Sequence, residues 1–94
     1  MKSNIKARIL IVDDEPELRT LLGHVLENAG YEITEASDGD EAINLLKKQK
    51  HEIALLDIQM PKLNGIQVLK FIKQNLPHTK AIMLTGYADL KYAM

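Results

Sequence analysis

Four short apolar runs divide the chain, and a polar or turn-forming segment follows each of them. Three runs have no alternation of apolar and polar residues, which is typical of strands buried on both faces of a parallel sheet. The second run alternates, with Tyr31 and Ile33 apolar and Glu32 and Thr34 polar. That alternation predicts an edge strand with one side facing water. The four runs are residues 9–12, 31–36, 53–56 and 81–84.

The segments between these runs have the spacing of amphipathic helices. The first predicted helix starts at Pro16, which suits a first helical turn, and ends at Gly30 in a left-handed cap. Its apolar residues predict one continuous buried stripe: Leu18, Leu21, Leu22, Val25, Leu26 and Ala29. In the second, Asp38 and Glu41 form a capping-box-like start.

The predicted core faces of the second and third helices are equally regular. That of the second helix consists of Ala42, Ile43, Leu45 and Leu46. The third helix begins at the Asn64-Gly65 turn, and its buried residues are Val68, Leu69, Ile72 and Leu76. Residues 89–94 are typical of the opening of a fourth helix.

Strands and helices therefore alternate, which predicts an α/β fold with a doubly wound, flavodoxin-like parallel sheet. We expect the strand order 2-1-3-4. Residues 81–84 have the character of a central strand, although this order leaves them at an edge. We therefore expect residues 1–94 to form one domain that lacks a fifth strand and a last helix.

Composition adds few constraints. The 94 residues are 46% hydrophobic and 27% charged, with a formal net charge of −1, which is typical of an ordinary globular domain and gives no basic surface for nucleic acid. There is no cysteine, so disulfides and thiolate metal sites are excluded. No signal peptide, membrane span or Gly-rich nucleotide loop is evident, and we expect a cytoplasmic protein. His24, His51 and His78 are expected at the surface without a ligand role.

Polar residues at the strand ends carry the candidate chemistry. Asp13 and Asp14 follow the first run, Asp57 follows the third, and Thr85 follows the fourth. Parallel strands deliver these ends to one edge of the sheet, where open α/β folds bind their ligands. Three carboxylates there repel one another by on the order of 1 kcal/mol per pair or more, so either one takes up a proton or a divalent cation binds. Oxygen ligands suit Mg²⁺.

A carboxylate beside Mg²⁺ can act as a nucleophile on a phosphoryl group and form an acyl phosphate. Each acid alone has a simpler interpretation. Asp13 and Asp14 can cap the following helix, Asp57 can cap a strand end, and Thr85 can be a turn residue. Their convergence is what favours a metal site.

The chain resembles the receiver domain of bacterial two-component response regulators. The resemblance rests on the Asp13-Asp14 pair, on Asp57-x-x-Met60-Pro61, on Asn64-Gly65 and on Thr85-Gly86, and it spans nearly the whole chain. It implies a phosphoprotein of phosphorelay signal transduction. The family also places a lysine at the end of a fifth strand, which this sequence does not reach.

The resemblance also implies a role for each matching residue. Asp57 would accept the phosphoryl group from a histidine kinase, and Asp14, Asp57 and the backbone carbonyl of Gln59 would bind Mg²⁺. Asp13 would act on the metal through a water. Thr85 would be the switch hydroxyl and Gly86 would leave room for it. Independently of the resemblance, we expect Met60 to be a packing residue and Pro61 to shape the loop.

Three functions are therefore compared. The first is a phosphoacceptor signalling module, not itself an enzyme, that switches contacts with an output domain or a downstream protein. The second is a non-phosphorylated, receiver-like interaction module that dimerises through the fourth strand or the surface of the fourth helix. The third, a hydrolase with Asp57 as nucleophile, ranks last because the sequence offers no dedicated general base.

Overall fold

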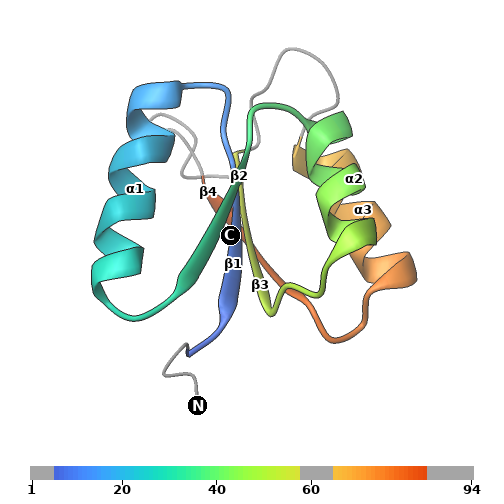
Figure 1. Ribbon diagram of the computed structural model, residues 1–94. Helices are drawn as coiled ribbons and strands as arrows, with labels where there is room; N and C mark the ends of the chain where they lie inside the picture. Colours follow the sequence, from blue (N-terminus) through green and yellow to red (C-terminus); the bar gives the residue numbers. More distant parts are fainter. Residues whose placement is uncertain (1–5, 58–64, 85–94) are drawn as a thin grey trace.

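The structure, a computed structural model, describes residues 6–57 and 65–84, in which four strands alternate with three helices (Figure 1). The strands are β1 (Arg8–Val12), β2 (Glu32–Ala36), β3 (Ile53–Asp57) and β4 (Lys80–Leu84). The helices are α1 (Pro16–Asn28), α2 (Gly39–Lys48) and α3 (Gly65–Asn75). Residues 89–94, predicted to start a fourth helix, lie outside the described residues.

The four strands form one parallel sheet in the order β2-β1-β3-β4, which confirms the predicted fold class and strand order. In the register, Val12 of β1 pairs with Ala36 of β2 and with Leu56 of β3. Asp57 pairs with Leu84 of β4. The carboxyl ends of β1, β3 and β4 therefore meet at one edge of the sheet.

Local sequence signals determine several boundaries as predicted. Pro16 occupies the first turn of α1, and Gly30 has φ 103°, the left-handed conformation that glycine adopts at little cost. The Asp38 side chain caps α2 by accepting the Glu41 N–H at 2.9 Å. The Glu41 carboxylate in turn accepts the Ser37 N–H at 2.8 Å, which completes a capping box displaced by one residue.

Helices α2 and α3 cover one face of the sheet, and α1 lies on the other (Figure 1). The core between the sheet and α2 and α3 is built from residues that are at most 4% exposed. They are Leu10, Val12, Ala36, Ala42, Leu46, Ala54, Leu56, Val68 and Ile72. The predicted buried positions of α2 and α3 thus lie at or against this core, because residues three and four apart share one helix face; the exception is Ile43, which is half-buried but is not part of this cluster.

The predicted continuous buried stripe on α1 is wrong. Leu21 and Val25 are 60% and 56% exposed, Leu18 and Ala29 are also exposed, and only Leu22 and Leu26 are half-buried. The physical reason is that α1 packs on β2 and β1 and, within residues 6–57 and 65–84, leaves the half of this face formed by β3 and β4 largely uncovered.

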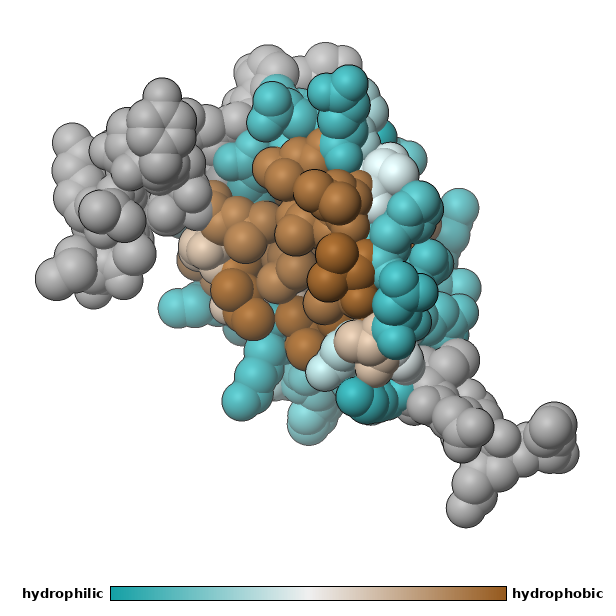
Figure 2. Space-filling model, turned by 90° about the vertical axis from the view of Figure 1, so that its left-hand side faces the viewer, coloured by the Kyte–Doolittle hydropathy of each residue, from teal (hydrophilic) through white to brown (hydrophobic). Residues whose placement is uncertain are grey.

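The uncovered half of the face is apolar. Ile82 of β4 is 49% exposed, although its neighbours Ala81 and Met83 pack on the core of the opposite face. Seen from the α1 side, the molecule presents a continuous apolar area (Figure 2). Residues 81–84 therefore have the composition of a central strand but the exposure of an edge strand within the described residues.

Candidate functional site

The acids after β1 and β3 meet at the carboxyl edge of the sheet. Oxygen atoms of Asp13, Asp14 and Asp57 lie within 4.8 Å of one another. Asp13 is 2% exposed, Asp57 is half-buried and Asp14 is exposed. The pairing of β1 with β3 dictates this geometry, because Val12 lies opposite Leu56, and the next residues, Asp13 and Asp57, therefore lie side by side at the end of the two strands. The structure therefore confirms the predicted convergence of the three acids.

Hydrogen bonds hold both the backbone and the carboxylate of Asp13 in place. Its N–H donates to the Ala36 carbonyl at 3.1 Å, continuing the ladder between β1 and β2. Its carboxylate accepts the Glu15 N–H at 2.8 Å. Glu15 itself is the N-cap residue of α1 but makes no side-chain cap, so the aspartate carboxylate satisfies a free N–H at the start of the helix.

This arrangement fits a hard divalent cation. Carboxylate oxygens are the preferred ligands of Mg²⁺, which keeps several of its waters. A cation also removes the repulsion among three carboxylates this close together, which is on the order of 1 kcal/mol per pair even when water screens it strongly. The exposure of Asp14 leaves the cluster accessible from solvent. The three side chains thus form a group of carboxylates that could hold a magnesium ion.

Five predicted site residues lie outside the described residues: Gln59, Met60, Pro61, Thr85 and Gly86. Their roles therefore stay predictions.

Sequence reasoning missed two residues next to the acids. Arg19 of α1 donates to the Asp13 carbonyl and forms an ion pair of 3.0 Å with Glu35 of β2. A basic residue in the first turn of the helix that follows an acid pair is a signal that could have identified Arg19. Nothing in the alternation of β2 distinguishes Glu35 as its partner.

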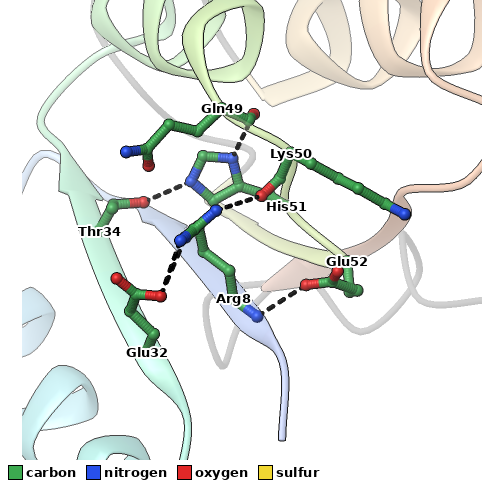
Figure 3. A network of polar contacts seen from close by, with 7 residues as sticks. All are labelled: Arg8, Glu32, Thr34, Gln49, Lys50, His51 and Glu52. Carbon is green, nitrogen blue, oxygen red and sulfur yellow. Dashed lines mark hydrogen bonds and ion pairs between the residues drawn. The ribbon is translucent and has the colours of Figure 1, made fainter. Parts of the chain in front are cut away.

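The prediction that His51 lies at the surface is wrong, whereas His24 and His78 are exposed as predicted. His51 is 1% exposed, and its Nε2 lies 2.7 Å from the Thr34 hydroxyl (Figure 3). His51 lies just before β3, at the amino edge of the sheet, where Thr34 of β2 is its polar partner. Burial lowers the pKa of His51 below 6.5.

A second cluster of charges surrounds His51 at the amino edge of the sheet (Figure 3). Arg8 donates to the Glu32 carboxylate at 2.9 and 3.2 Å and to the Lys50 carbonyl at 3.1 Å. Its backbone N–H donates to Glu52 at 2.7 Å, which lowers the pKa of the Glu52 carboxyl. A cavity of about 360 Å³ also lies at this edge, lined by Leu46, His51, Leu76 and Thr79 among others. These features stand at the opposite end of the strands from Asp57.

Comparison with known proteins establishes the class of this fold and site. The sequence model of the response regulator receiver domain matches residues 9–94. The chain belongs to this family, the receiver domains of two-component systems.

Individual proteins with similar sequences support this family assignment. The alkaline phosphatase synthesis transcriptional regulatory protein PhoP of Bacillus subtilis is 42% identical over 79 residues, which cover 84% of this chain and 33% of PhoP. Sporulation initiation phosphotransferase F of the same organism is 35% identical over 83 residues, covering 88% of this chain and 67% of that protein. This chain thus spans about a third of the length of the first relative and two thirds of the second.

Solved structures show the same fold. The response regulator TrrA of Thermotoga maritima, in complex with Mg²⁺ and BeF, superimposes with a TM-score of 0.84 at 38% identity. The match covers 93% of this chain and 76% of TrrA. Among the described residues, no helix is long and apolar enough to cross a membrane.

Proposed function

We propose that this chain is a phosphoacceptor signalling module in which Asp57 takes a phosphoryl group from the phosphohistidine of a histidine kinase. The observation that carries the proposal is the cluster of Asp13, Asp14 and Asp57 within 4.8 Å, formed by two neighbouring strand ends. Membership of the receiver family supports it, because response regulators homologous to this chain accept phosphoryl groups.

The proposed reaction uses Asp57 as the nucleophile. A carboxylate oxygen of Asp57 bonds to phosphorus, the bond between phosphorus and the histidine nitrogen breaks, and the imidazole leaves. The rigid end of β3 holds the carboxylate in place, so little conformational freedom is lost on the way to the transition state. When bound, Mg²⁺ supplies neutralisation of the charge on the transferring oxygens.

The other residues complete the site within the same proposal. Asp14, Asp57 and the Gln59 backbone carbonyl hold the ion, and Asp13 acts through a water. The Thr85 hydroxyl bonds the new phosphoryl group in the space beside Gly86. Met60 and Pro61 shape the intervening loop. The movement of Thr85 towards the phosphoryl group then alters contacts with an output domain or a downstream protein.

Amide NMR of the full chain with Mg²⁺ and beryllofluoride tests this function. We expect shifts for residues 13–15 and 57 in the wild-type protein and none in Asp57→Ala. Asp40→Ala removes an exposed acid from the first turn of α2 and is the matched control, which should respond like wild type. A wild-type protein without any response would exclude phosphoacceptor function.

A second function is favoured by one observation. The apolar face over β3 and β4, with Ile82 49% exposed, is the kind of surface that mediates contacts between proteins. As an interaction module, the chain would dimerise through β4. Light scattering should then show a dimer that Ile82→Asp dissociates and Ile66→Asp, at a 42% exposed position on α3, does not. A monomer at millimolar concentration would rule out the dimer.

A further inference from the structure

Arg19 links three elements next to the acid cluster. From the first turns of α1, its Nη1 donates to the Asp13 carbonyl at 2.5 Å. Its Nε donates to the Glu35 carboxylate of β2 at 3.0 Å. The Arg19 side chain is only 16% exposed, and its two partners hold the guanidinium in one orientation, although the Glu35 side chain is itself 39% exposed and water reaches that ion pair. The turn between β1 and α1 is therefore bridged to β2 through one side chain.

The carbonyl that Arg19 holds belongs to a residue of the cluster itself. With this bond, Asp13 is fixed at its N–H by Ala36, at its carboxylate by the Glu15 N–H and at its carbonyl by Arg19. The peptide that Arg19 contacts leads directly to Asp14. A displacement of this peptide would therefore move the carboxylates of both residues relative to Asp57.

We propose that Arg19 is a positioning residue for the metal site, which presets Asp13 and Asp14 for Mg²⁺ through its bridge from the Asp13 carbonyl to Glu35. The inference deepens the proposed function and rests on it for the identity of the ion. Arg19 does not touch the ion or the phosphoryl group. Arg19 strengthens Mg²⁺ binding because it already holds Asp13 and Asp14 in place, so binding of the ion does not have to cost the entropy of ordering them.

If Arg19 is a positioning residue, its removal should weaken Mg²⁺ binding, whereas its charge alone predicts the opposite effect. A guanidinium near the cluster repels a cation, so loss of its charge alone would tighten Mg²⁺ binding. Loss of positioning weakens binding, and residues that orient metal ligands typically contribute about 10- to 100-fold in affinity. The sign of the change in the dissociation constant for Mg²⁺ therefore separates the two roles.

The chain provides a matched control at the other end of the sheet. Arg8 makes the same set of contacts, pairing with Glu32 of β2 and donating to the Lys50 backbone carbonyl (Figure 3). Arg8→Gln therefore removes an equivalent ion pair and carbonyl bond far from Asp57. A purely structural role for Arg19 predicts that Arg19→Gln and Arg8→Gln lower the melting temperature alike and leave Mg²⁺ affinity unchanged.

The experiment is calorimetric titration of the full chain with MgCl₂ at pH 7 and fixed ionic strength. We expect Arg19→Gln to raise the dissociation constant about tenfold, Arg19→Lys to raise it less, and Arg8→Gln to leave it unchanged. In the Arg19→Gln background, Glu35→Gln should have no further effect because the bridge is already broken. An unchanged or lower dissociation constant in Arg19→Gln would overturn the inference.

A metal-free readout separates this inference from the proposed function. Hydrogen exchange of the Glu15 amide, which donates to Asp13, should speed up in Arg19→Gln but not in Arg8→Gln without Mg²⁺. If wild type fails to bind Mg²⁺, the magnesium site is wrong, and the inference fails with it even if Glu15 loses protection. If wild type binds Mg²⁺ and the two Arg variants exchange alike, only the positioning role is wrong.

Discussion

His51 is bonded to Thr34 across the amino edge of the sheet, with 2.7 Å between Nε2 and the threonine hydroxyl. The other ring nitrogen, Nδ1, lies 3.1 Å from the Gln49 carbonyl. A carbonyl can only accept, so Nδ1 carries the proton and the neutral ring accepts at Nε2 from Thr34. The His51 carbonyl accepts from the Thr79 hydroxyl at 2.6 Å. One neutral histidine thereby links β2, the end of α2 and the start of β4.

This link predicts a loss of stability in mild acid. Burial is the largest effect on His51 and lowers its pKa in the folded protein. The hydrogen bond to the Gln49 carbonyl raises the pKa, the positive charge of Arg8 lowers it, and the negative charges of Glu52 and Glu32 raise it, with a net lowering. The unfolded chain, with a pKa near 6.5, then binds more protons than the folded one. The contribution of His51 is fully present above pH 6.5. It is lost as the pH falls through 6.5 towards the lowered pKa of the folded state.

Urea unfolding between pH 8 and pH 5 measures this effect. The free energy of unfolding of wild type should fall faster with decreasing pH than that of His51→Gln, whose side chain does not titrate. His78→Gln replaces an exposed histidine and should follow wild type. Parallel curves for wild type and His51→Gln would show that burial of His51 does not couple folding to pH.

The acid cluster predicts a destabilised metal-free protein. Carboxylate oxygens within 4.8 Å repel one another, so Asp14→Asn should raise the free energy of unfolding without Mg²⁺ by about 1 kcal/mol. Millimolar Mg²⁺ should stabilise wild type, because the ion binds the folded state, and should stabilise the variant much less. Thermal unfolding with and without EDTA provides the measurement. Asp40→Asn, on α2, is the control, and destabilisation by Asp14→Asn in EDTA would contradict the prediction.

The sequence was sufficient for the features that depend on local pattern and on strand direction. Parallel strands must bring their carboxyl ends to one edge, so the meeting of Asp13 and Asp57 followed from the order of elements together with the predicted place of β1 beside β3. The caps at Gly30 and Asp38 followed from backbone chemistry within a few residues.

Features that depend on distant partners could not be predicted in this way. His51 is polar and lies beside a helix end. Its burial depends on Thr34, 17 residues away, as well as on the nearby Gln49 carbonyl. The spacing of Leu21 and Val25 indicates a helix face, but whether that face is covered depends on how far α1 reaches over the sheet. Arg19 and Glu35 likewise become partners only through the packing of α1 on β2.

The Asp38 cap predicts a moderate local effect. Asp38→Ala leaves the Glu41 N–H at the start of α2 without its acceptor, and it should lower the free energy of unfolding by about 1 kcal/mol. Asp38→Asn keeps an acceptor oxygen and should cost only a few tenths of that amount. Chemical denaturation measures both variants. An equal loss in the two would mean that the charge of Asp38, rather than its hydrogen bond, stabilises the helix.

Two leucines on helices provide the sharpest test of the packing. Leu46 of α2 is 4% exposed and lies in the core, whereas Leu21 of α1 is 60% exposed. Leu46→Ala should therefore cost about 2–5 kcal/mol, because it removes buried apolar surface and leaves a cavity. Leu21→Ala should cost less than about 0.5 kcal/mol, since alanine is also the better helix former. Equal losses on urea unfolding would mean that the face of α1 around Leu21 is covered in solution.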